Sequence, residues 1–361
     1  METSELVHIE EPLEEWDGEL LSVRHDRQTG AWLIVAVHST VLGPASGGTR
    51  AMHYPSPGHA VTDVTRLAGA MTLKMAVAGL PMGGGKAVIA LPRPKAAVDA
   101  ADWRRLLNLY AEVLERLNGT YWTGPDVGTG SGDMDVLRAT TRYAFGASSA
   151  LGGPGSSAPA TAAGVFAAIQ ASCAEAGFEG LYGRRVLVQG MGAVGSLVGE
   201  LVSDAGAQLL VTDIDPARCR NAVDRGARFV ASADTTSTEC DILVPCATGG
   251  LIDAATARTL PCRVIAGAAN NPLAGDGAAT VLAERGVTYA PDFVANAGGA
   301  IHLVGRQVLG WTAEMVDERT AAIGTTLQTI FADSRARGIT AEQAARDLAT
   351  RRLQPTVRVG S

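Results

Sequence analysis

The sequence has 361 residues, of which 47% are hydrophobic and 19% are charged, and its formal net charge is −7. This length predicts two domains, and the net charge argues against a nucleic-acid partner because phosphate binding needs a concentrated positive surface. The apolar stretches are too short to cross a bilayer, so we expect no membrane association. Met1–Asp17 is acidic and has no hydrophobic core segment, so we expect no signal peptide and a cytoplasmic protein.

The cysteines and histidines give no sign of a metal centre. The five cysteines form no CxxC pair and the six histidines are dispersed. We therefore expect reduced thiols and no bound metal. The 43 glycines, by contrast, gather in clusters, which predicts backbone that turns sharply or lies close to a ligand.

The first third of the chain is predicted to be mixed α/β. The predicted strands are Leu20–Arg24, Ala31–His38 and Lys86–Leu91, and the predicted helices are residues 58–79 and Asp102–Leu117. The first two strands flank a turn at residues 28–30 and form a hairpin. The second helix has apolar residues at helical spacing and is therefore amphipathic.

Residues 152–157 form a glycine-rich loop that predicts a domain junction. Beyond it, short apolar runs alternate with helical segments, which is typical of a parallel sheet covered by helices on both faces. The predicted strands are Arg185–Gln189, Gln208–Thr212, Ile242–Val244 and Val264–Ala266, and the predicted helices are Ala160–Ala176 and Ala193–Asp204. Thr312–Arg352 is a further helical segment, which we expect to pack back across the junction or against the first domain.

The segment Gly190–Gly195 fits the pattern GxGxxG between a predicted strand and a predicted helix. Gly190 permits the tight turn, Gly192 admits a pyrophosphate to the backbone, and Gly195 lets helix and strand pack closely. Ala193 and Val194 open the helix, whose free N–H groups and dipole favour phosphate. The spacing therefore predicts a dinucleotide site.

Asp213 follows the next predicted strand and can accept hydrogen bonds from both ribose hydroxyls of the adenosine half. A 2′-phosphate would be repelled there, which favours NAD over NADP, although Arg218 and Arg220 leave NADP open. We therefore expect a Rossmann-type NAD-binding domain over residues 151–311. The substrate domain is expected over residues 1–150, joined by C-terminal helices over 312–361.

A second glycine cluster, Gly83–Gly85, stands immediately before Lys86. The phosphate-loop pattern fails here because Ala87 replaces the hydroxyl residue that would bind magnesium. Lys74 lies in an otherwise apolar helical segment, where a lysine needs either solvent or an anion. The two lysines are therefore candidates for binding an anionic substrate, with a solvated turn as the alternative.

Six segments, taken together and in this order, resemble the superfamily of glutamate, leucine, phenylalanine and valine dehydrogenases. The resemblance covers nearly the whole chain and is strongest to bacterial phenylalanine dehydrogenases. The segments are Gly43–Arg50, Lys74–Lys86, Thr123–Val127, Gly190–Gly195, Gly267–Asn271 and Pro291–Gly299.

The resemblance implies an NAD-dependent oxidative deamination of a hydrophobic L-amino acid to the 2-oxo acid and ammonium, in a homo-oligomer. It also implies an α/β fold of two domains separated by a cleft, the first for substrate and oligomerisation, the second a doubly wound parallel sheet. Lys86 is implied as the general base that activates water, Asp126 as the group that exchanges protons with the amine, and Lys74 as the partner of the α-carboxylate. The remaining implied positions are Gly48 and Asn270 for substrate and nicotinamide, with Thr161, Ile214 and Ala247 for cofactor.

The side-chain pocket is expected to be apolar. Where glutamate enzymes of the family carry a lysine, this chain has Ser46, which disfavours a buried carboxylate. Ser46 and Gly124 are both small and are expected to leave room for a ring, so L-phenylalanine is the first expected substrate, with Met71 and Ala297 as wall residues. The alternatives are a leucine or valine dehydrogenase with the same mechanism and a catalytically silent NAD-binding sensor.

Overall fold

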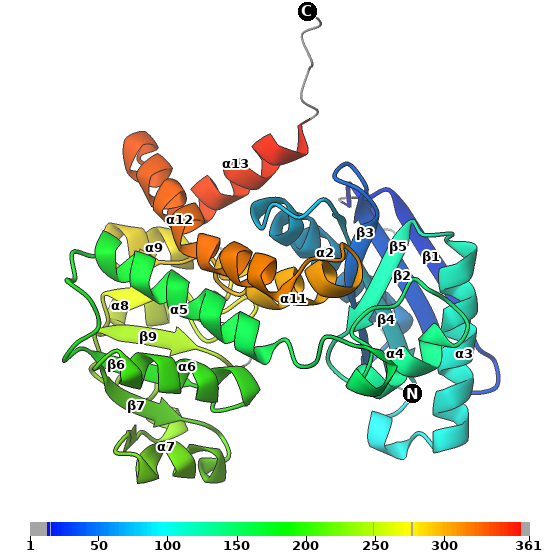
Figure 1. Ribbon diagram of the computed structural model, residues 1–361, viewed down its shortest axis with the longest axis horizontal. Helices are drawn as coiled ribbons and strands as arrows, with labels where there is room; N and C mark the ends of the chain where they lie inside the picture. Colours follow the sequence, from blue (N-terminus) through cyan, green and yellow to red (C-terminus); the bar gives the residue numbers. More distant parts are fainter. Residues whose placement is uncertain (1–12, 15, 248, 276, 355–361) are drawn as a thin grey trace, which may run out of the picture. The chain divides into compact units, whose positions relative to one another are not determined.

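The computed structural model of the protein describes residues 13–14, 16–247, 249–275 and 277–354. They form two compact units (Figure 1). The first unit comprises the described residues up to Gly155, Arg306–Gly310 and the described residues from Arg352 on. The second unit comprises Ser156–Gly305 and Trp311–Arg351, so the chain first passes between the units inside the loop where the junction is predicted.

The first unit is built on a mixed five-stranded sheet of order β1-β2-β4-β3-β5. The predicted hairpin is confirmed, because β1 and β2 are antiparallel, with Leu20 opposite Val37. Strand β4 is antiparallel to β2 and parallel to β3, which is parallel to β5. The bounds are β1 Leu20–His25, β2 Trp32–Ser39, β3 Ala45–His53, β4 Gly83–Leu91 and β5 Tyr121–Pro125.

Helices cover both faces of this sheet (Figure 1). Helix α2 (Pro57–Val77) begins after Ser56, whose side chain accepts from the His59 N–H, with Pro57 in the first turn. It packs its small residues on Ile34, Ala36, Val88 and Ala90. Helices α3 (Ala100–Arg116) and α4 (Ser131–Arg138) lie on the other face. Because strand side chains alternate, each β4 residue belongs to one helix layer or the other.

The second unit contains a six-stranded sheet in which every pair is parallel, with order β11-β10-β9-β6-β7-β8. Numbered within the unit, this is the 3-2-1-4-5-6 order of the doubly wound dinucleotide-binding fold. The predicted Rossmann-type sheet is therefore confirmed. The strands are β6 Arg185–Gln189, β7 Gln208–Thr212, β8 Arg228–Phe229, β9 Ile242–Pro245, β10 Val264–Ile265 and β11 Thr288–Tyr289.

Helix α5 precedes the first of these strands, α6 to α9 lie between strands, and α10 and α11 follow the last strand (Figure 1). Helix α5 contacts α6, β10 and β11, while α8 and α9 pack together against a core that includes Leu187, Leu243 and Ile265. The bounds are α5 Ala158–Glu175, α6 Ala193–Asp204, α7 Arg220–Asp224, α8 Ala254–Thr259, α9 Ala278–Glu284, α10 Asp292–Ala295 and α11 Gly298–Gln307.

Most of the C-terminal segment belongs to the second unit and not to the first domain, and the described residues from Arg352 on belong to the first unit. It forms two helices, α12 (Ala313–Arg337) and α13 (Ala341–Leu353), which belong to the second unit up to Arg351. Helix α12 packs along α5, where Gly164 lies against Ile323 without a Cβ between them. Gly338, at φ +65°, ends α12 in the left-handed conformation. Residues 355–361 of the expected segment lie outside the described residues.

Within the part of the chain that the structure describes, the longest helices are too polar to serve as membrane spans.

Candidate active site

Lys86 and Asp126 form a largely buried ion pair in the first unit. Lys86 lies in β4, and its side chain is 8% exposed. Its Nζ lies 2.7 Å from Oδ2 of Asp126, the residue that follows β5. Burial raises the pKa of Asp126, but the positive charges of Lys86 and Arg50 outweigh it and hold that pKa below its ordinary value. The two residues predicted to be catalytic are thus brought together, with Asp126 ionised.

Glycines allow the strands to bring this pair together. A Cβ on Gly48 would lie 2.8 Å from both the Cβ of Asp126 and the carbonyl oxygen of Pro125, so a larger residue would push Asp126 away. A Cβ on Gly47 would overlap the Gly85 carbonyl. The Gly48 carbonyl, predicted to bind substrate, lies 3.5 Å from the Tyr121 hydroxyl. The glycine clusters therefore serve close packing of the strands beside Lys86 and Asp126.

The backbone of Asp126 is fixed by a short turn. Its N–H donates to Oγ1 of Thr129 at 2.9 Å, and that hydroxyl donates to the Thr49 carbonyl at 2.7 Å. Gly128, at φ +80°, lies where any Cβ would overlap the Ala51 carbonyl. The loop is therefore tied to β3 independently of the Asp126 carboxylate.

The prediction missed a third charged residue at this site. Nε of Arg50, in β3, lies 3.4 Å from the same Asp126 Oδ2 that Lys86 contacts. Arg50 stands at the end of the quoted Gly43–Arg50 motif, but no role was assigned to it. Its side chain is 19% exposed, which is low enough for its charge to act strongly on a neighbour.

Lys74 and Met71 lie in α2, the helix that covers the face of the sheet onto which Lys86 projects. This assignment follows from alternation in β4, because a Cβ on Gly84 would meet Thr72 of α2, and Val88 packs in the α2 layer. Lys74 is in the last turn of α2, and both residues are partly buried. The structure therefore places both on the helix that faces the ion pair.

The predicted side-chain pocket is only partly as expected. Ser46 is fully buried, pairs in register with Gly84 and Trp122, and its Oγ has no hydrogen-bond partner among the described residues. Gly124 does not leave room for a substrate ring, because a Cβ there would already overlap the ring of Phe145. Phe145 is 5% exposed and its N–H donates to the Thr123 carbonyl at 2.8 Å. Phe145 is a second residue that the prediction missed.

In the second unit, the loop Gly190–Gly195 has the geometry that its glycines predict. Gly190 has φ +95°, and a Cβ there would lie 2.7 Å from that of Ala247. A Cβ on Gly195 would overlap the Gly190 carbonyl, so this glycine allows α6 to approach β6. Gly192 differs, because nothing lies within 4 Å of its Cβ position. Ala193 and Val194 open α6, so their N–H groups belong to its free first turn.

Asp213 is 8% exposed and already accepts two backbone hydrogen bonds. Its Oδ2 accepts from the Met191 N–H at 2.8 Å and its Oδ1 from the Asp215 N–H at 2.9 Å. Each carboxylate oxygen keeps a further lone pair. The carboxylate therefore braces the glycine loop and can still accept from ribose. Ile214, beside it, is 92% exposed.

Ala247 and Asn270 follow β9 and β10, so they lie at the same carboxyl edge of the parallel sheet as the Gly190 loop and Asp213. Ligands of this fold bind at that edge. Oδ1 of Asn270 accepts from Nδ2 of Asn296 at 2.8 Å, and Asn296 is 7% exposed. The predicted cofactor residues after the strands are therefore brought together.

Thr161 and Ala297 lie beside one another in the second unit. Thr161 is in the first turn of α5, and a Cβ on Gly299 would lie 2.7 Å from its Oγ1. Ala297 immediately precedes α11 and is 1% exposed. Ala297 therefore belongs to the packing of α11 on α5, and within this unit it offers almost no surface to a ligand.

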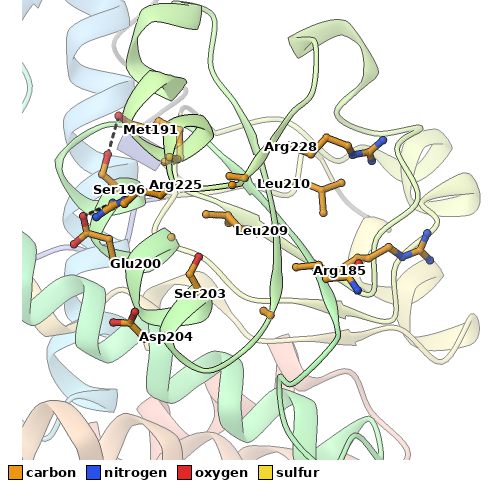
Figure 2. A pocket seen from close by; sticks show the side chains of 16 residues that line it. Arg185, Met191, Ser196, Glu200, Ser203, Asp204, Leu209, Leu210, Arg225 and Arg228 are labelled. Carbon is orange, nitrogen blue, oxygen red and sulfur yellow. Dashed lines mark hydrogen bonds and ion pairs between the residues drawn. The ribbon is translucent and has the colours of Figure 1, made fainter.

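A pocket of about 980 Å³ in the second unit lies elsewhere (Figure 2). Met191 and Ser196 line one side, and Arg185 and Arg228 lie on the opposite side. Arg225 pairs with Glu200 at 2.6 Å on its wall. The predicted cofactor residues are not among those that line it, so this pocket is distinct from the dinucleotide surface.

The fold order, the open Gly192 position and the buried Asp213 define a dinucleotide-binding unit, and the other unit holds a buried lysine–aspartate pair. This combination is that of an NAD(P)-dependent dehydrogenase. The chain belongs to the Glu/Leu/Phe/Val dehydrogenase family: the model of that family's dimerisation domain matches residues 21–143, and the glutamate/leucine/phenylalanine/valine dehydrogenase model matches residues 152–217 and 213–357. It is therefore an amino-acid dehydrogenase by family.

Three relatives are similar over most of their length. Leucine dehydrogenase of Thermoactinomyces intermedius is 39% identical over 344 residues, which cover 95% of this chain and 92% of the relative. Valine dehydrogenase of Streptomyces virginiae is 39% identical, covering 91% of each. L-tryptophan dehydrogenase of Nostoc punctiforme is 37% identical, covering 92% and 93%. The family is confirmed, but these relatives do not support the narrower resemblance to phenylalanine dehydrogenases.

Solved structures show the same two-domain fold. The crystal structure of L-tryptophan dehydrogenase from Nostoc punctiforme aligns with a TM-score of 0.80 at 34% identity, covering 95% of this chain and 98% of that one. Hetero-hexameric glutamate dehydrogenase from Thermus thermophilus, in a leucine-bound form, aligns with a TM-score of 0.77 at 25% identity, covering 96% and 93%.

Proposed function

We propose that this protein catalyses the NAD-dependent oxidative deamination of an apolar L-amino acid, releasing the 2-oxo acid and ammonium, and the reverse reaction. The observation that carries the proposal is the Lys86–Asp126 pair, 2.7 Å apart, with the lysine side chain 8% exposed. A general base has to lie within hydrogen-bond reach of the proton that it takes, and this pair holds two groups able to exchange protons at one place in the first unit. Family membership supplies the reaction class.

The chain's own residues have separate tasks in this reaction. Lys74 holds the α-carboxylate of the substrate. Asp126 exchanges a proton with the substrate amine, and Lys86 takes a proton from the water that attacks the α-carbon after oxidation. When bound, NAD accepts the hydride of that carbon. Water addition and proton return then release ammonium from the carbinolamine, leaving the carbonyl of the 2-oxo acid.

The cofactor proposed is NAD, held by the residues at the carboxyl edge of the second unit's sheet. The N–H groups at Gly192–Val194 would take the pyrophosphate, and nothing in the protein lies against the Gly192 position. Asp213 would accept from the adenosine ribose, where its charge would repel a 2′-phosphate. Arg218 lies 3.9 Å from Asp215 and both side chains are more than half exposed, so this surface pair leaves the charge of Arg218 accessible and the repeat of the assay with NADP tests the preference.

For the side chain of the substrate, we place leucine or valine before phenylalanine. Phe145 occupies the space over Gly124 on which the expectation of a ring depended. Ser46 is small but fully buried and offers no surface to a ring, so L-phenylalanine is the second candidate. Pocket differences of a methylene or a ring change selectivity by only a few kcal/mol, so activity on both kinds of side chain is expected.

We also propose a cytoplasmic homo-oligomer. All five cysteines are free, which is typical of a reducing compartment. The match to a dimerisation-domain model supports self-association through the first unit.

The test is NADH formation at alkaline pH with NAD and a panel of L-amino acids, repeated with NADP. Preference for leucine or valine supports the full proposal. Preference for phenylalanine supports the mechanism but contradicts the inference that Phe145 excludes a ring from the pocket. Tight NADH binding without turnover of any amino acid would contradict the proposal and favour an NAD-binding sensor.

A further inference from the structure

Asp126 faces two cations from two neighbouring strands. Lys86 of β4 approaches Oδ2 at 2.7 Å, and Arg50 of β3 approaches the same oxygen with Nε at 3.4 Å. The proposed reaction uses Lys86 and Asp126 directly but gives Arg50 no task. Burying a cation costs free energy unless opposite charges compensate it.

Arg50 is itself held from α2. Its Nη1 donates to Oδ2 of Asp63 at 2.9 Å, and Asp63 also accepts from the Tyr54 hydroxyl at 2.7 Å and from Nη2 of Arg66 at 2.9 Å. The guanidinium thus donates a hydrogen bond from Nη1 to Asp63, while Nε lies 3.4 Å from Asp126 as an ion-pair contact that is not aligned as a hydrogen bond. The planar group is held on its Asp63 side, which a flexible lysine ammonium would not reproduce.

The charge balance differs with and without Arg50. With Arg50 in place, two carboxylates, Asp126 and Asp63, alternate with two cations, and Arg66 adds a third cation at the exposed end. Among the described residues, Tyr121 of β5 also faces Asp126; burial raises its pKa well above its ordinary value, so it stays neutral. Lys74 lies in α2, the helix that covers this face of the sheet. Without Arg50, Asp126 keeps Lys86 and the backbone hydrogen bond from Val127 but loses the positive charge on the β3 side.

We propose that Arg50 is a positioning residue that shares Oδ2 of Asp126 with Lys86, orients this carboxylate and leaves the lysine free to exchange its proton. The inference rests on the proposed function, because it assigns a role in the same reaction. The backbone of Asp126 does not need Arg50, since Thr129 ties it to β3. Loss of Arg50 is therefore expected to alter the carboxylate and not the loop.

The test compares Arg50→Gln with Arg50→Lys and with the matched control Arg66→Gln, which removes the other arginine on Asp63 without touching Asp126. Removing a nearby positive charge favours proton binding, so the pKa of Asp126 rises and its ionised form is lost at higher pH. We expect R50Q to lower kcat by about 10- to 100-fold with a smaller change in KM. The acidic limb of its kcat/KM profile should move to higher pH, R50K should move it back, and R66Q should change neither.

A second readout does not depend on turnover. Carboxyl ¹³C NMR of the aspartates, with Asp126 assigned through D126N, should show Asp126 titrating at higher pH in R50Q than in the unmodified protein. If the unmodified protein turns over no amino acid, the proposed function fails while this titration still tests Arg50. A folded R50Q with unchanged pH profile and unchanged Asp126 titration would overturn the role.

Should R50Q fail to fold, Asp63→Asn takes its place, because it removes the carboxylate that holds the guanidinium. D63N should then lower kcat more than R66Q does. Equal rates in D63N and R66Q would equally overturn the role of Arg50.

Discussion

Gly192→Ala, in the dinucleotide loop, should weaken cofactor binding while leaving the stability of the folded protein almost unchanged. Nothing in the protein lies within 4 Å of the added methyl group, and Gly192 has φ −78°, which alanine adopts freely. The residue is the N-cap of α6, where replacing glycine by alanine costs up to about 1 kcal/mol. Stability should therefore fall only slightly.

Affinity for the dinucleotide should fall much more. The methyl group would occupy the face through which a pyrophosphate reaches the backbone. Losing one hydrogen bond to a charged group costs about 1.5–3 kcal/mol, which weakens the dissociation constant about 10- to 150-fold. NADH fluorescence titration and thermal unfolding measure the two effects on the same sample.

Gly195→Ala is the matched comparison within the loop. Its methyl group would overlap the Gly190 carbonyl and lie 3.2 Å from the Cβ of Cys246, so backbone would have to move. Such overpacking costs about 1–3 kcal/mol, so this variant should lose stability first. The reasoning is refuted if G192A binds NADH as tightly as the unmodified protein, or if it is as unstable as G195A.

Three further outcomes are expected. Lys86→Ala should reduce kcat by about 10²–10⁴-fold while NADH affinity stays within twofold, and substantial remaining turnover would remove Lys86 from its role. Phe145→Ala should free the space over Gly124 and raise the ratio of phenylalanine to leucine turnover by about 10-fold or more; an unchanged ratio would place the substrate side chain elsewhere. The side-chain hydrogen bond from Arg105, opposed by burial and aided by Thr29, lowers the pKa of Asp26 to about 2. The stability that this carboxylate contributes should therefore be present above about pH 4 and lost as the pH falls towards 2. The difference in free energy of unfolding between the unmodified protein and Asp26→Asn should shrink over that range. A difference that stays constant would contradict this role of Asp26.

The alternation of apolar runs and helical segments predicted most of the second unit from the sequence. Arg185–Gln189, Gln208–Thr212 and the helix Ala193–Asp204 have the observed bounds. The pattern missed β8 and β11, which are two residues each, but found the equally short β10 because Val264–Ala266 is an apolar run. It also missed the ten-residue α11, so length alone did not decide which elements were recognised.

The strands that carry the site were the harder part. Strand β3 begins Ala45-Ser46-Gly47-Gly48, a composition that local propensity assigns to a turn. It is a strand because Gly47 has to pass against the Gly85 carbonyl, a contact set by tertiary packing. The same holds for Gly83–Gly85, which extend β4 beyond the predicted start at Lys86.

Arg50 and Phe145 were missed for a related reason. Each acts through a partner that is remote in the sequence. Arg50 reaches Asp63 and Asp126 only because β3 lies between β4 and β5 under α2. Phe145 covers Gly124 only because the backbone at Thr123 pairs with Tyr143 and Phe145. Neither pairing has a local signal, so spacing alone could not locate them.

Some glycines of this chain are required by close packing and others are not, and the sequence alone does not distinguish the two kinds. Gly48, Gly124 and Gly195 stand where an added Cβ would meet another part of the protein, so folding alone accounts for them. Gly192 is the second glycine of the Gly190–Gly195 motif, yet its Cβ position is open and its backbone conformation is one that any residue adopts. Packing and backbone conformation therefore allow a side chain at position 192, as they do at Gly130 and Gly132. A pyrophosphate bound at the loop, as proposed, would be what excludes one, and G192A tests this directly because its methyl group meets nothing in the protein.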